Sequence, residues 1–116
     1  MINSSFVEMI LPEGVLVYFD ATGLTKESNQ IHIFLSEKNI PPTEYQGDHL
    51  TSKGFYDEIT VQDFPIRNKA VFLHIKRRKW FNETRGYNVY RDWDMVAKGT
   101  RMTQEFASFL KGIARH

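Results

Sequence analysis

The chain has 116 residues, of which 41% are hydrophobic and 25% are charged, and it contains no cysteine. This length fits one domain, since domains most often have roughly 100–150 residues, and the composition favours neither a disordered nor a membrane protein. The absence of cysteine excludes disulfides, thiolate nucleophiles and thiolate zinc sites.

The net charge of +1 hides a strong asymmetry along the chain. Residues 1–66 carry three lysines against ten acidic residues, a balance of −7, whereas residues 67–116 carry twelve Lys and Arg residues against four acidic ones, a balance of +8. Such asymmetry indicates contact with nucleic acid or another acidic partner. If the fold interleaves the two halves, their opposite charges would lie side by side and would cancel at the protein surface.

The N-terminal residues have no positively charged region before their few apolar residues, and no run of about 18 or more apolar residues occurs in the chain. We therefore expect a cytoplasmic location and no membrane partner. We also expect residues 1–10 to be poorly ordered and residues 11–116 to form a single domain.

The first half contains one clear hairpin pattern. Residues 15–19 form either a short helix or the lead into a strand, because periodicity does not decide so short a run. Apolar residues at 31, 33 and 35 then alternate with their neighbours, which predicts a hairpin of 19–25 with 30–37. Residues 38–55, rich in Pro, Gly and polar residues, indicate a long connection without helix or strand, and 59–64 resume a strand that ends at Pro65.

The second half predicts a basic hairpin followed by a helix. Residues 71–76 alternate and run out through a basic segment, 82–86 form a loop, and 87–91 return as the antiparallel partner. Four apolar residues then recur at i, i+3, i+4 and i+7, with Thr103 as a candidate N-cap: Phe106, Phe109, Leu110 and Ile113. The expected fold is therefore α+β, a small antiparallel sheet or two hairpins closed by a C-terminal helix.

No catalytic or cofactor motif is present. The sequence has no GxSxG elbow, HExxH pair, P-loop or GxGxxG, so we expect neither an enzyme nor a cofactor. The four histidines lack metal-ligand spacing, and we interpret His32 and His74 as solvent-facing or hydrogen-bonded strand residues rather than as metal ligands.

The basic residues of the second half support two interpretations. A run of four at 76–79 is followed by Trp80 and Phe81, and basic residues near aromatic ones are typical of a nucleic-acid surface. The alternative is a solvated edge strand whose charges prevent edge-to-edge pairing. The candidate DNA-binding residues are Lys76, Arg77, Arg78, Lys79, Arg67, Lys69, Arg85 and Arg91.

Four linked segments, LTSKGFY at 50–56, TVQDFPI at 60–66, VFLHIKRR at 71–78 and VAKGTRMT at 96–103, resemble the N-terminal region of ISAon-type insertion-sequence transposases. That region is a short separate protein encoded upstream of the catalytic one. DFPI, the following strand and Arg77-Arg78 are also remotely similar to the zinc-ribbon N-terminal region of ISL-type transposases. Because the cysteines of that family are missing here, the resemblance implies a degenerate, zinc-free ribbon in which aromatic packing replaces the metal.

The resemblance implies a bacterial accessory role in transposition and DNA recombination, namely helping to recognise or hold the ends of the element. The expected partners are double-stranded DNA at the terminal repeats and the catalytic transposase encoded downstream. The alternative is a protein–protein module whose helical residues Phe106, Phe109, Leu110 and Ile113 dock on the transposase without DNA contact. The sequence leaves open whether the chain forms a homodimer.

Overall fold

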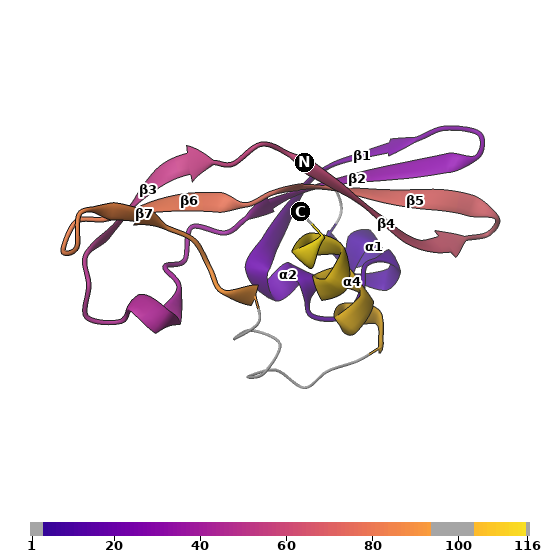
Figure 1. Cartoon of the computed structure of the whole chain (residues 1–116). Helices are drawn as coiled ribbons and strands as arrows, with labels where there is room; N and C mark the ends of the chain where they lie inside the picture. Colours follow the sequence, from indigo (N-terminus) through magenta and orange to yellow (C-terminus); the bar gives the residue numbers. More distant parts are fainter. Residues whose placement is uncertain (1–3, 94–103, 116) are drawn as a thin grey trace.

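The computed structural model describes residues 4–93 and 104–115, and it shows the expected α+β fold. Two short helices precede the strands, a 3-10 turn precedes β3, and a longer helix ends the chain (Figure 1). The elements are α1 (Ser4–Ile10), α2 (Val15–Tyr18), β1 (Phe19–Lys26), β2 (Gln30–Glu37), η1 (Thr43–Tyr45), β3 (Leu50–Phe55), β4 (Ile59–Ile66), β5 (Lys69–Lys76), β6 (Arg78–Asn82), β7 (Tyr87–Val89) and α4 (Gln104–Ala114).

The strands form a four-stranded sheet, in the order β1-β2-β5-β4, and a three-stranded sheet, in the order β3-β6-β7. The hairpin β1–β2 confirms the first one that the sequence predicts. The second is only partly correct, because 87–89 pair with 80–82 of β6, whereas 71–76 belong to β5 in the other sheet. The β2–β5 pair is parallel, with Ile33 opposite Leu73, so the larger sheet is mixed. A parallel pair needs a crossover connection, and here η1, β3 and β4 lie within that crossover.

β5 and β6 follow each other along one run of chain that links the two sheets. β5 is an inner strand of the four-stranded sheet and β6 is the central strand of the three-stranded sheet, with Arg77 between them. Figure 1 shows the two sheets extending in opposite directions from this point, and the molecule measures 49 × 27 × 26 Å. Arg77 therefore lies at the junction of the sheets.

The helices cover one face of the four-stranded sheet and enclose the core (Figure 1). Alternate residues of β2, β4 and β5 point into this core, as the period of two requires, and α4 packs on them through its apolar face. The buried residues of α4 are Phe106, Phe109, Leu110, Gly112 and Ile113. The prediction that Thr103 caps this helix lies outside the described residues.

One expectation about local structure is wrong. Residues 38–55 are not without strand structure, because β3 occupies 50–55 and pairs with β6. The segment has no apolar alternation since β3 is a half-exposed edge strand. Residues 4–10 form α1, and Val7 is buried in the core. Residues 15–19 were expected to form a short helix or to lead into a strand, and both occur, because α2 ends at Tyr18 and β1 begins at Phe19.

Among the described residues, no helix is long and apolar enough to cross a membrane.

Candidate nucleic-acid interface

The predicted DNA-binding residues do not share one surface. Arg67 lies in the turn between β4 and β5 and Lys69 begins β5, whereas Arg85 lies in the turn between β6 and β7. Figure 1 shows these two turns at opposite ends of the molecule. Arg67 and Lys69 therefore lie far from Arg85, and a compact site of the size of one hairpin does not bring all three together.

Arg91 is buried and serves the fold. Its side chain donates from Nε to Oε2 of Glu37 at 3.1 Å and from Nη2 to the carbonyl of Ile40 at 2.6 Å. Arg91 is only 5% exposed and Glu37 is 1% exposed. The prediction that Arg91 contacts DNA is wrong, because its charge is neutralised inside the protein.

Arg78 is also held by internal contacts. Its main-chain N–H donates to Oε1 of Glu37 at 3.0 Å, and its Nε donates to the carbonyl of the same residue at 3.2 Å. Nη1 donates to Ser52 Oγ at 2.6 Å, and the guanidinium lies 4.6 Å from the centroid of the Phe55 ring. Burial raises the pKa of Glu37, and the hydrogen bonds from Arg78 and Arg91 oppose that shift. Arg78 therefore fastens β2 to β6.

Arg85 makes an ion pair that fixes the β6–β7 turn. Its Nε lies 2.8 Å from Oδ2 of Asp48, which also accepts a hydrogen bond from Asn82 Nδ2 at 2.9 Å. These two bonds lower the pKa of Asp48, and the carboxylate raises the pKa of Arg85. The positive charge of Arg85 is therefore balanced by Asp48.

The remaining residues of the basic run point to different faces of the molecule. Lys76 lies on the outer face, in a hollow that Phe34 and Glu58 also line. Arg77 lines a different cavity, on the side where α4 packs, together with Tyr56 and Ile113. The basic run is thus divided by the alternation of the strand.

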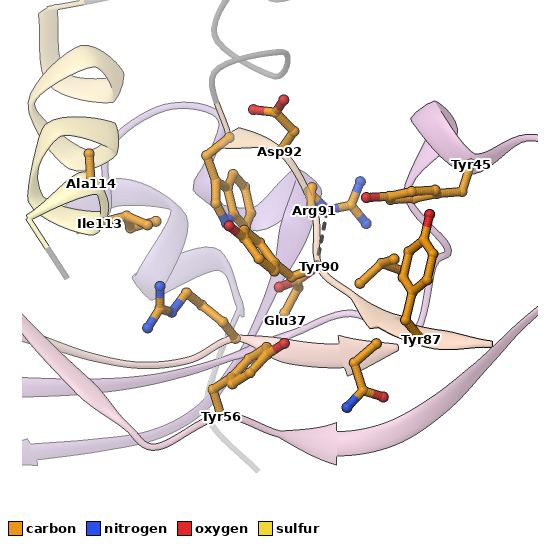
Figure 2. Close-up of a pocket in the computed structure, with 13 residues that line it drawn as sticks. Glu37, Tyr45, Tyr56, Tyr87, Tyr90, Arg91, Asp92, Ile113 and Ala114 are labelled. Carbon is orange, nitrogen blue, oxygen red and sulfur yellow. Dashed lines mark hydrogen bonds and ion pairs between the residues drawn. The ribbon is translucent and has the colours of Figure 1, made fainter. Parts of the chain in front are cut away.

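The cavity beside Arg77 is a cleft of about 760 Å³ where the two sheets meet. Four of the five tyrosines of the chain line it, and they come from separate segments. Figure 2 shows Tyr45 and Tyr87 at one end of this cleft, with Ile113 and Ala114 of α4 at the other. We call it the tyrosine cleft, and its defining residues are Tyr45, Tyr56, Tyr87, Tyr90 and Arg77.

Two cations lie beside the rings of the tyrosine cleft. Nε of Arg77 is buried and has no hydrogen-bond acceptor among the described residues. Nζ of Lys79 lies 5.0 Å from the centroid of the Tyr56 ring, and that ring meets Tyr90 edge to face at 6.2 Å. A main-chain bond of 2.8 Å from Tyr56 N to the Arg77 carbonyl holds the two segments together. Positive charge and aromatic surface therefore converge here.

Sequence reasoning missed the tyrosines. Each lies in or near a segment that we interpreted as a loop or as a short returning strand, and their spacing gives no periodic signal. The only available signal was composition, since Tyr87 and Tyr90 stand close to the basic run. Their convergence depends on β3 pairing with β6, which the sequence does not show.

The outer face of the four-stranded sheet carries a pair of histidines. His32 Nδ1 lies 2.8 Å from His74 Nε2, and the chain of hydrogen bonds continues to Gln30 at one end and Thr60 at the other. Phe34 stacks on His74 with centroids 4.6 Å apart. This confirms hydrogen-bonded strand histidines, and the described residues contain no group of three or more His, Asp or Glu side chains that could hold a metal ion.

The predicted docking surface on α4 is wrong. Phe106, Phe109, Leu110 and Ile113 are all at most 8% exposed, because they pack on the chain's own sheet. A partner protein could reach these side chains only if the core opened. Any docking on a transposase must use other residues.

The chain matches no protein-family model, no curated protein and no solved structure.

Proposed function

We propose that this chain is a non-catalytic DNA-binding accessory module of an insertion-sequence transposase, and that it contacts DNA at the tyrosine cleft. The observation that carries the proposal is the convergence of Arg77, Lys79 and four tyrosines at the junction of the two sheets. Arg and Lys bind phosphate oxygens, and aromatic rings stack on bases, so this combination suits nucleic acid.

The charge distribution supports the same partner. Of the predicted cations, Arg78, Arg85 and Arg91 are occupied by internal acceptors, whereas Arg77 has a buried Nε without an acceptor in the described part of the chain. Because Arg77 lines the cleft, guanidinium nitrogens other than the buried Nε can form a charge-assisted bond to a phosphate oxygen. Lys79 adds a second positive charge at the rim of the cleft.

The transposase context is supported by the four segments that resemble the N-terminal region of ISAon-type transposases. Two of them contribute to the tyrosine cleft, since 50–56 ends at Tyr56 and 71–78 contains Arg77. In this proposal the chain holds the element ends in the cytoplasm while the downstream protein performs the chemistry.

A mobility-shift assay tests the proposal with two duplexes, one carrying the terminal repeat of the element that encodes this chain and one of random sequence. We expect binding to both at about 50 mM salt, since phosphate contacts are independent of sequence. Lys79→Ala weakens binding, whereas Lys76→Ala, which removes the same charge three residues away on the outer face, has a smaller effect. Absence of any shift overturns the proposal.

Docking on the catalytic transposase remains the second candidate, on a different surface. Met9 of α1 is 84% exposed and Val17 of α2 is 62% exposed, so both apolar side chains are accessible to a partner protein. If Met9→Ser and Val17→Ser abolish co-purification with the transposase while DNA binding persists, both activities reside in one chain.

A further inference from the structure

We infer that the tyrosine cleft accepts an unpaired nucleotide, with its base against the tyrosine rings and its phosphate at Arg77. This inference rests on the proposed function and gives it a more specific ligand. A protein that holds the ends of a DNA element meets both paired and unpaired nucleotides, and the two differ in what they can offer to a concave aromatic site.

The size of the tyrosine cleft favours an unpaired nucleotide over a duplex. Its volume of about 760 Å³ lies within the range of roughly 300–1,000 Å³ that is typical of pockets for small ligands. In a duplex the bases are stacked and enclosed by two backbones, so only their edges are available. A base that has left the stack can present its whole ring to the cleft.

The exposure of the tyrosine rings supports the stacking of a base on them. Tyr87 is 51% exposed and Tyr90 is 61% exposed, so both leave aromatic surface in water on the free protein. Tyr45 and Tyr56 are half-buried and line the same cleft. Every base has a π-face that can cover such rings, which makes this contact independent of sequence.

The charges of the cleft orient the nucleotide. The buried ion pair with Glu37 neutralises Arg91. The positive charge that a phosphate meets therefore comes from Arg77, which lines the cleft, and from Lys79, whose Nζ lies over the Tyr56 ring. The phosphate therefore lies at the Arg77 side, and the amide of Asn88, another lining residue, is available to a base edge.

Fluorescence anisotropy with matched probes tests this inference. The probes share sequence and label and comprise a blunt duplex, the same duplex with a short single-stranded overhang, and the single strand. We expect the two probes with unpaired nucleotides to bind about tenfold more tightly than the blunt duplex, in line with the effect of stacking one base on an aromatic ring.

Substitutions test whether the tyrosine rings themselves cause the preference for unpaired probes. Tyr90→Ala and Tyr87→Ala should abolish the preference for unpaired probes, so that the ratio of their affinity to that of the blunt duplex falls to about one, and the fold should persist because both side chains are exposed. The matched control is Phe64→Ala, which removes an aromatic ring that is 51% exposed on β4 and does not line the cleft. Circular dichroism checks that each variant is folded.

Each outcome decides a different claim. Equal binding of all three probes, or a preference that survives in Tyr90→Ala and Tyr87→Ala together, overturns the inference and leaves the proposed function standing. Failure of every probe to bind overturns both.

Discussion

Glu37 and Arg91, which lie 54 positions apart in the sequence, form a buried ion pair with 3.1 Å between Oε2 and Nε. Glu37 ends β2 in the four-stranded sheet, and Arg91 follows β7 in the three-stranded sheet. The same carboxylate accepts the main-chain N–H of Arg78. One acidic side chain thus ties together the two sheets whose junction forms the tyrosine cleft.

Removing one partner of this pair should strongly destabilise the protein. Arg91→Met leaves the Glu37 carboxylate buried without its cation, and such changes typically cost about 3–5 kcal/mol. The double variant Glu37→Leu with Arg91→Met should be less destabilised than the sum of the single variants, since it buries no unpaired charge. Urea unfolding measures the loss of stability in the single and the double variants. If the loss in the double variant equals the sum of the losses in the single variants, the pairing is contradicted.

Asp63 should make stability depend on pH. Burial raises the pKa of Asp63, and the nearby charge of Glu105 raises it further, against one hydrogen bond from the main chain of Phe64. The folded protein therefore binds this proton more tightly than the unfolded chain. The stability contributed by Asp63 is complete below the ordinary pKa of 3.8 and is lost as the pH rises through the raised value.

The variant Asp63→Asn removes that loss. We expect its melting temperature to exceed that of the wild type at neutral pH and the difference to vanish in acid, below the ordinary carboxyl range. Thermal unfolding followed by circular dichroism across this range is the measurement. Asp57→Asn, at an exposed position between β3 and β4, serves as the control. A lower melting temperature of Asp63→Asn at neutral pH would show that the carboxylate stabilises the fold.

Gly112 should resist a substitution that normally stabilises helices. Gly to Ala in a helix is usually favourable by up to about 1 kcal/mol, but a Cβ at Gly112 would overlap Cγ1 of Val61 on β4. We expect Gly112→Ala to cost roughly 1–3 kcal/mol through overpacking. In the background of Val61→Ala the same change should cost less, since the blocking methyl groups are absent.

The control for Gly112 is Ser108→Ala, which lies on the exposed side of α4. Chemical denaturation gives the free energy of unfolding of the wild type, the two single variants Gly112→Ala and Val61→Ala, their double variant and the control. The first four values together give the coupling free energy between positions 112 and 61. An increase in the free energy of unfolding of Gly112→Ala would contradict the close packing of α4 on β4 at this position.

Local patterns predicted those elements that are exposed on one side and buried on the other. The apolar positions of α4 recur with the helical period, and β2 and β5 alternate, because each element packs one face on the core. β3 escaped prediction because it is an edge strand without a buried face of its own. A pattern of hydrophobicity carries no information about such a strand.

The site was harder to predict than the fold, for a physical reason. Charge along the sequence identified Arg77, Lys79 and Arg91 alike, and only the tertiary structure shows that Glu37 neutralises the last of them. Likewise, the tyrosines gather because distant strands pair, and the parallel register of β2 and β5 brings His32 to His74. Residue types indicated the class of ligand, but the partners that decide which charges are free come from remote parts of the chain.

The salt dependence of DNA affinity tests the central claim most directly. We predict that the logarithm of the association constant falls linearly with the logarithm of the salt concentration, and that Lys79→Ala reduces the slope by about 0.9, the amount for one lost phosphate contact on duplex DNA. Lys26→Ala, at the far end of β1, should leave the slope unchanged. Affinity that is insensitive to salt, or a slope that is the same in Lys79→Ala and the wild type, would contradict phosphate binding at the tyrosine cleft.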